Sequence, residues 1–182
     1  MSTLKTNAIQ TVAGKTILGS TGSILQVVYG EDTSQFDVTV LRSYQVYYSL
    51  NVTAIANNSR YVLDGFFTGW SGVSLTTVSG SRYGRSNIGY SVTISGSTTR
   101  ILGVDGINGD SWAQTSGAID PSGNVIVGQA LHSRPVVYTS TSPAGTLLTF
   151  NLLAAAYDVV PLRLTTSGYG QKSGFTIMEV SA

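Results

Sequence analysis

Histidine and serine side chains are the first groups in this sequence that could carry out chemistry. The chain has a single histidine, His132, and no cysteine, which excludes thiolate nucleophiles, disulfides and histidine-rich metal sites. Because 24 serines are present, a Ser–His–Asp arrangement can be drawn, but no Gly-x-Ser-x-Gly turn stands between a strand and a helix. His132 comes just before a predicted strand, and we interpret it as a structural residue.

The acidic side chains give no better catalytic pattern. Their only cluster lies in glycine-rich turns and consists of Asp105, Asp110 and Asp120. Glycan hydrolysis needs two carboxyl groups that face one cleft, and a calcium loop needs alternating oxygen ligands followed by a glutamate. Ile107 occupies a position where a calcium loop would need an oxygen ligand. The glycine-rich stretches 84–86 and 168–174 lack the Gly-x-x-x-x-Gly-Lys-Ser/Thr pattern of a phosphate site. We therefore predict no catalytic residue, no metal site and no cofactor.

Aromatic side chains indicate recognition instead of catalysis. Three of them stand in segments that we interpret as glycine-rich loops, near Asp, Asn or Arg: Trp70, Tyr83 and Trp112. A ring in such surroundings can cover the apolar face of a sugar while its polar neighbours bond the hydroxyl groups. Tyr, Trp and Arg are also enriched at subunit interfaces. Glycan contact and packing at an interface or in the core therefore both remain open for these three residues.

Charged residues are scarce. They make up 10% of the 182 residues, with 10 Lys+Arg, 9 Asp+Glu and a net charge of +1, against roughly 25% charged residues in an average soluble domain. A nucleic-acid partner is excluded, since it requires clustered cations, and 42% hydrophobic residues exclude a disordered chain. The surface must be largely neutral, supplied by 24 Ser, 22 Thr and 21 Gly. Such a surface suits a protein held in an assembly or an extracellular β-domain.

The elements that would position these side chains are predicted to be strands. Short alternating runs separated by turn clusters every 8–12 residues or so predict an all-β, jelly-roll-like sandwich over residues 29–182. We expect strands at 35–53, 61–67, 73–79, 86–94, 99–104, 124–129, 136–139, 146–151, 159–165 and 175–180. Gly65 indicates a bulge in its strand. The apolar run 152–157 fits a helical turn, a strand or a loop, and its sequence does not decide between them.

The first 28 residues differ from the rest. Their apolar residues are widely spaced, too few for a separate core, and include Leu4, Ile9, Ile17 and Leu18. We predict a segment for attachment or strand exchange; the alternative is one or two edge strands of the sandwich. The segment lacks the apolar stretch of a signal peptide, and the longest apolar run, 152–157, is far shorter than the 20 residues or so that span a bilayer. We expect no cleaved signal and no membrane insertion.

Three motifs in this opening region resemble a known family. Residues 2–10 read STLKTNAIQ, residues 14–18 read GKTIL and residues 22–28 read GSILQVV. Together they are similar to the start of many virion proteins of tailed bacteriophages, cyanophages included. The resemblance is looser in the rest of the chain, where the turn and strand at 58–63 and the closing strand at 175–182 look like those of the family's β-rich heads.

The resemblance implies a non-enzymatic virion protein, a homotrimeric short tail fibre whose head contacts the host surface, with a host-surface glycan as a possible partner. The segment 1–28 would then bind other virion proteins. A trimeric capsid decoration protein is the alternative, and a glycan-active enzyme is a third hypothesis from a different class. Such proteins are made and assembled in the host cytoplasm, whose reducing conditions fit a chain without cysteine.

Overall fold

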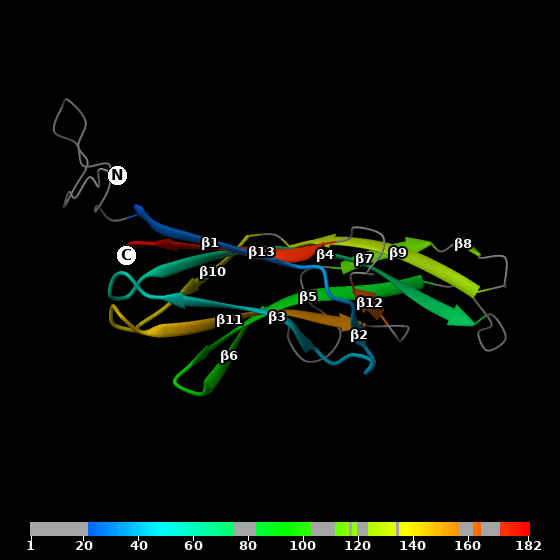
Figure 1. Cartoon of the computed structure of the whole chain (residues 1–182), viewed down its shortest axis with the longest axis horizontal. Helices are drawn as coiled ribbons and strands as arrows, with labels where there is room; N and C mark the ends of the chain where they lie inside the picture. Colours follow the sequence, from blue (N-terminus) through cyan, green and yellow to red (C-terminus); the bar gives the residue numbers. More distant parts are fainter. Residues whose placement is uncertain are drawn as a thin grey trace, which may run out of the picture.

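The computed structural model describes residues 22–74, 83–102, 112–116, 118–119, 124–133, 135–156, 162–164 and 172–182. Side chains are described in these ranges except at 70–74, 83–85, 112–131 and 162–163. Within the described ranges the chain forms thirteen strands and no helix. The strands build two antiparallel sheets, and Figure 1 shows β1, β13 and β4 in one layer and β3, β11 and β6 in the other. The predicted all-β sandwich is confirmed.

The eight-stranded sheet is organised around β4 (Arg60–Ser74). This long strand pairs with β13 and β12 along one side and with β10 and β9 along the other. The other strands of this sheet are β1 (Ile24–Asp32), β2 (Phe36–Val38), β8 (Ala118–Ile119), β9 (Asn124–His132), β10 (Val136–Thr139), β12 (Leu162–Leu164) and β13 (Ser173–Val180). Because β1 pairs only with β13 among the described strands, it forms an open edge.

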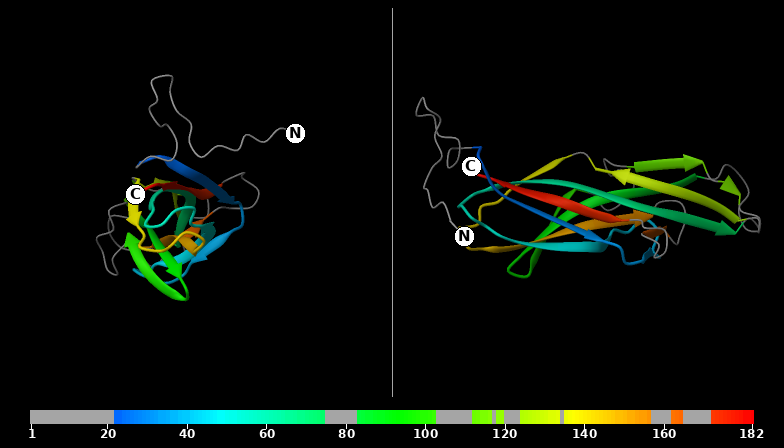
Figure 2. Two further views of the ribbon diagram at one scale, coloured as in Figure 1. Left: turned by 90° about the vertical axis from the view of Figure 1, so that its left-hand side faces the viewer. Right: turned by 45° about the horizontal axis from the view of Figure 1, so that its top comes forward.

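The five-stranded sheet has the order β3-β11-β5-β6, with β7 also paired to β5. Its strands are β3 (Gln45–Thr53), β5 (Tyr83–Ile94), β6 (Ser97–Leu102), β7 (Trp112–Ser116) and β11 (Leu147–Ala156). Ser95 and Gly96, with φ values of 50° and 81°, form the two-residue turn between β5 and β6. In the end-on view of Figure 2 the two sheets enclose the interior.

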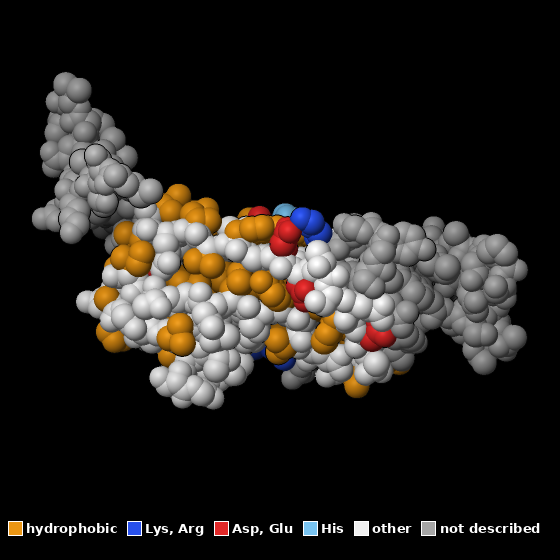
Figure 3. All heavy atoms as spheres, in the orientation of Figure 1, with side chains coloured by type: hydrophobic (Ala, Val, Ile, Leu, Met, Phe, Trp, Pro, Cys, Tyr) orange, Lys and Arg blue, Asp and Glu red, His pale blue; other side chains and the backbone are white. Residues whose placement is uncertain are grey.

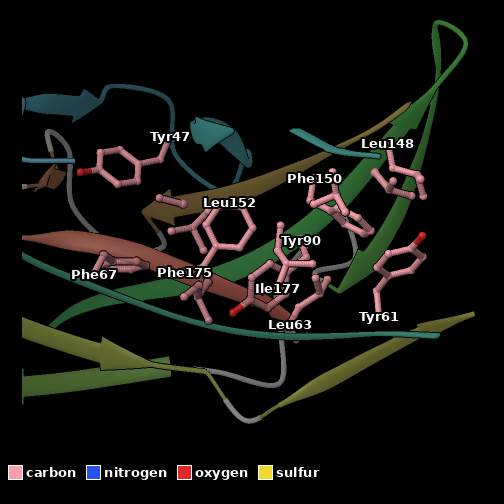
Figure 4. Packing of buried hydrophobic residues seen from close by; sticks show 14 of the residues in the cluster. Tyr47, Tyr61, Leu63, Phe67, Tyr90, Leu148, Phe150, Leu152, Phe175 and Ile177 are labelled. Carbon is pink, nitrogen blue, oxygen red and sulfur yellow. The ribbon is translucent and has the colours of Figure 1, made fainter. Parts of the chain in front are cut away.

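The core lies between the sheets and is built from the side chains that point inward at every second residue of each strand. In β4 the odd-numbered residues Tyr61, Leu63 and Phe67 are buried, while the even-numbered ones are only half-buried. Across the interior they contact residues of β5 and β11. The ring centroids of Tyr61 and Phe150, for example, are separated by 5.1 Å. Figure 4 shows these side chains pointing into the space between the layers. Burial of such large apolar groups is the main stabilising contribution to the sandwich.

The undecided run 152–157 is a strand as far as Ala156. It forms the second half of β11, the central strand between β3 and β5, and every residue from Phe150 to Ala156 is buried. A strand covered on both faces has no polar side, so its sequence is a continuous apolar run instead of an alternation. This is why periodicity could not separate a strand from a helical turn here. Tyr157 lies outside the described residues.

The predicted bulge at Gly65 is wrong. β4 pairs with β13 in unbroken register through this residue, which lies opposite Phe175. A Cβ atom at position 65 would lie 2.6 Å from Tyr90 Oη and 3.0 Å from the Cβ of Phe175. Glycine is therefore needed because the side chains of the facing sheet and the neighbouring strand come close to its backbone, which is the other common reason for glycine inside a strand.

The first strand crosses the expected boundary at residue 28. β1 starts at Ile24, and its first residues already pair with β13, with Ile24 opposite Val180 and Val28 opposite Ile177. The N–H of Gly22 donates to the carbonyl of Ser181 (3.0 Å). The sheet thus includes residues 24–28, and the part of the predicted attachment segment that lies outside the described structure is residues 1–21.

Candidate interaction surface

His132 is placed on the outer face of the eight-stranded sheet. Its Nε2 lies 3.5 Å from Oδ1 of Asp64 in the neighbouring strand, and its side chain is two-thirds exposed. The next residue, Ser133, is buried and turns into the core. A Ser–His–Asp relay needs the histidine to bond the serine hydroxyl, whereas Ser133 is engaged elsewhere. This geometry agrees with a structural interpretation of His132.

Ser133 belongs to a buried polar cluster. Its hydroxyl is hydrogen-bonded to the hydroxyl of Tyr90 and accepts the N–H of Gly65 (3.1 Å), while its own N–H donates to the carbonyl of Gly65 (2.8 Å). Burial raises the pKa of Tyr90, which therefore remains a neutral phenol. The cluster joins β5 to β4 and to the chain after β9, so its role is to fix the two sheets relative to each other.

A second buried polar cluster surrounds the carboxylate of Glu179, which points into the sandwich from β13. Glu179 has no exposed surface. It accepts hydrogen bonds from Ser59 Oγ (2.6 Å), from the N–H groups of Ile55 (2.9 Å) and Ala56 (3.2 Å), and from the side-chain amide of Gln26. The single carboxylate thereby holds β13, β1 and the turn before β4 together.

The hydrogen bonds decide the charge state of Glu179. Burial on its own raises the pKa of a carboxyl group, but the bonds from Ser59, Gln26 and the two backbone N–H groups outweigh burial and lower the pKa of Glu179. The charged form is therefore the native one. Its charge and the burial of the ring together raise the pKa of the neighbouring Tyr61, with burial the larger cause.

The three aromatic residues singled out in the sequence lie in strands, so the expectation that they lie in loops is wrong. Trp70 is inside β4, paired with Gly128 and Arg163. Tyr83 and Trp112 start β5 and β7, two strands that pair with each other. Their side chains fall outside the described ones, as do all atoms of Leu4, Ile9, Ile17 and Leu18. Contact with a glycan or a subunit remains a prediction for these residues.

The outer face of the eight-stranded sheet carries a row of apolar side chains. Val27, Met178, Val62 and Val137 are successive register partners on β1, β13, β4 and β10. Val27 and Val137 at its two ends are 56% and 58% exposed. Four adjacent strands give this apolar row a length of about 14 Å. Ile24 and Tyr29, both about half exposed, extend it along β1.

Charged groups border the apolar row. Lys172 Nζ and Glu31 Oε1 are 2.6 Å apart, and the hydroxyl of Tyr29 donates to the other carboxylate oxygen of Glu31 (2.8 Å). The hydrogen bond from Lys172 is the largest cause that lowers the pKa of Glu31. Figure 3 shows hydrophobic side chains along the upper rim of the molecule, over β1, and then a group of charged side chains.

The outer face of the five-stranded sheet has a different character. Hydrogen-bonded polar side chains run across it from β3 to β5: Ser49 donates to Asn151 (2.7 Å), and Asn151 donates to Ser91 (3.1 Å). Thr149 donates to Asn51 in the same way (2.8 Å). Ser49 and Asn51 are exposed, so they give this face a neutral polar surface, while Asn151 and Ser91 are buried and link the strands beneath it. The apolar row leaves part of the opposite face without such a polar surface.

Sequence reasoning missed the apolar row and the Glu179 cluster. The row left one signal, because 61–63 and 66–67 in β4 are consecutive apolar residues instead of a strict alternation. An outward apolar residue in one strand is ordinary, and only the register aligns four of them. For Glu179, the signal was an acid at an inward position of an otherwise apolar alternation in 175–180.

The described side chains contain no group of three or more His, Asp or Glu placed to hold a metal ion. Across the part of the chain that the structure describes, no helix has the length and apolar character needed to cross a membrane.

Comparison with known proteins gives little similarity. No protein-family model matches the chain, and no curated protein matches it. Among solved structures, that of the infectious bursal disease virus Gt strain matches with 16% identity and a TM-score of 0.26, covering 87% of this chain and 41% of that one. The VP2 subviral particle of the same virus matches with 14% identity and a TM-score of 0.26, over 98% and 46% of the two chains. The chain thus spans less than half the length of these structures, and we draw nothing from a likeness at this level.

Proposed function

We propose that the chain is a non-enzymatic structural protein of a tailed-bacteriophage particle, a homotrimeric tail-fibre component that exposes its sandwich for attachment to the host surface. The observation that carries a role in an assembly is the apolar row on one outer face, in a chain with a net charge of +1. The trimer itself is inferred from the low charge, the N-terminal segment and the family resemblance. Exposed apolar patches are typical of surfaces that other chains cover. The small net charge opposes association with further copies only weakly.

The resemblance of residues 2–28 to the start of tailed-phage virion proteins supports the same function. In the proposal, residues 1–21 attach the protein to other virion proteins, and Leu4, Ile9, Ile17 and Leu18 supply their apolar contacts. Trp70, Tyr83 and Trp112 contact either a host-surface glycan or a neighbouring subunit. The protein is made in the host cytoplasm and is found in the finished particle.

A capsid decoration protein is the second candidate, since the neutral polar face and the apolar row suit a subunit fixed on a shell equally well. Location separates the two candidates. Immunogold electron microscopy of purified particles should label the tail tip for a fibre and the whole shell for a decoration protein. Quantitative mass spectrometry should give few copies per particle in the first case and a number matching the shell in the second.

Two results would contradict the proposal. Absence of the chain from purified particles would exclude a virion role. Light scattering on the purified chain should give a mass that is a whole multiple of three chains of 19.1 kDa, and a monomer at micromolar concentration would exclude the trimer.

A further inference from the structure

The charges beside the apolar row are arranged symmetrically about it. The outward residues of β4 read Arg60, Val62 and Asp64, so that a cation and an anion stand on opposite sides of the row. Each lies two residues from Val62, which is about 6.6 Å along a strand. The exposed Arg60 has no ion-pair partner among the described side chains. Oδ1 of Asp64 is buried and lies 3.5 Å from Nε2 of His132, but the Asp64 side chain is 41% exposed, so its other carboxylate oxygen is the one open to a further partner. Both groups retain capacity for a further partner.

We propose that this face binds the same face of a second copy of the chain. The two-fold axis would run parallel to the apolar row, midway between the facing eight-stranded sheets of the two copies. Such an axis places Val62 over Val62 and reverses the strand direction. Arg60 of each copy then faces Asp64 of the other, and Ile24 faces Tyr29. The apolar row of each copy is then covered along its whole length, and the interface contains two Arg60–Asp64 ion pairs.

A second copy fits this face better than an unrelated partner for two reasons. The pattern of cation, apolar row and anion is its own complement under the two-fold operation, which is the property that an isologous interface requires. On the opposite face of the sandwich, the apolar Leu147 and Leu153 of β11 are separated by the hydrogen-bonded Thr149 and Asn151, so polar side chains interrupt the apolar ones there. The two faces therefore differ in what they can bind, and pairs of copies form through one of them.

The inference does not rest on the proposed virion function. A three-fold association through other surfaces would coexist with it, and each pair would then join two trimers. The virion role and the face-to-face pair can therefore be tested separately. Disrupting the face-to-face contact should halve the mass of the associated protein in solution, whether each half is one chain or three.

The test uses the full chain and light scattering at micromolar concentration. Arg60→Asp or Asp64→Arg should halve the mass relative to the unmodified chain, since each places like charges across the axis. The double variant Arg60→Asp with Asp64→Arg should restore it, because the charges are exchanged but still complementary. Val137→Asp should also halve the mass. Val46→Asp, on β3 and similarly exposed at 51%, is the matched control and should leave the mass unchanged.

A cross-link identifies the occupant directly. The chain contains no cysteine, so Val62→Cys provides one thiol per copy, and facing sheets lie about 10 Å apart. A bismaleimide of that reach should link two copies through position 62, and Arg60→Asp in the same chain should abolish the link. Circular dichroism of every variant checks that the sandwich has folded.

Three results would overturn the inference. The first is an unmodified chain whose mass equals that of folded Val137→Asp. The second is a double charge variant that stays at half mass although it is folded. The third is an associated chain whose Val62→Cys variant is not linked, which would mean that residues 1–21 or another protein cover the face.

Discussion

The carboxylate of Glu179 and the hydroxyl of Ser59 lie 2.6 Å apart, although 120 residues separate them in the chain. The contact joins β13, the last strand in the chain order of the described strands, to the turn that precedes β4. Because Gln26 also donates to this carboxylate, the same group fixes the start of β1. One buried charge thus fixes three segments, the start of β1, the end of β13 and the turn before β4, at one end of the sandwich.

Replacing Glu179 should destabilise the fold strongly. Glu179→Ala leaves the buried Ser59 hydroxyl and the partly buried N–H groups of Ile55 and Ala56 without their acceptor, at a cost of about 2–4 kcal/mol in the free energy of unfolding. Urea unfolding at neutral pH measures this cost. Glu31→Gln, at an exposed acid, is the control and should have a much smaller effect; equal effects would contradict the assigned role of Glu179.

The stability should also depend on pH through Glu179. Its native pKa is lowered, so its contribution is fully present above the unfolded-state value of about 4.3 and is lost as the pH falls through the native pKa. Urea titrations from about pH 6 down to pH 3 should show this loss in the unmodified chain. Glu179→Gln should be less stable at pH 6 and should lose less stability on acidification. A parallel pH dependence in both chains would refute the assignment.

The Tyr90–Ser133 pair should show energetic coupling. Ser133→Ala removes the acceptor of the Gly65 N–H and the partner of the Tyr90 hydroxyl, and should cost about 1–3 kcal/mol. In a double-mutant cycle with Tyr90→Phe, the coupling energy should be at least about 0.5 kcal/mol. Additive losses in the two single variants would show that the hydroxyl groups do not act together.

Truncation of two adjacent leucines should lower the stability by very different amounts. Leu148 is fully buried and Leu147 is 55% exposed, because successive residues of β11 point to opposite faces. Leu148→Ala should cost about 2–5 kcal/mol, and Leu147→Ala less than about 0.5 kcal/mol. Thermal unfolding of the two variants is the measurement, and the reverse order would mean that β11 is shifted by one residue.

Gly65→Ala should destabilise through crowding. The added Cβ would lie 2.6 Å from Tyr90 Oη, and overpacking of this kind costs about 1–3 kcal/mol. The same substitution made together with Tyr90→Phe should cost less, since the nearest atom is then absent. An undiminished cost in that background would place the clash at Phe175 or Leu152 instead.

Much of the fold could be predicted from local pattern. The strand at 61–67 and the break between the strands at 86–94 and 99–104 depend mainly on neighbouring residues, and the structure has a strand and a turn at these places. β11 and Gly65 could not be assigned correctly, because their surroundings come from distant strands. The apolar row joins residues 27, 62, 137 and 178 through pairings that no single segment encodes. The Arg60–Val62–Asp64 pattern acquires meaning only once that row is known.

The position of β13 between β1 and β4 has a consequence for the timing of synthesis. β13 emerges from the ribosome after every other described strand, yet it is the only strand to which β1 is hydrogen-bonded among them. The apolar row is therefore incomplete until Met178 has been made, since Met178 joins Val27 to Val62 in the row. A nascent chain that has not yet reached residue 178 cannot present the complete row to its neighbours on the same messenger RNA, so the proposed pairing of faces would have to wait until β13 has docked.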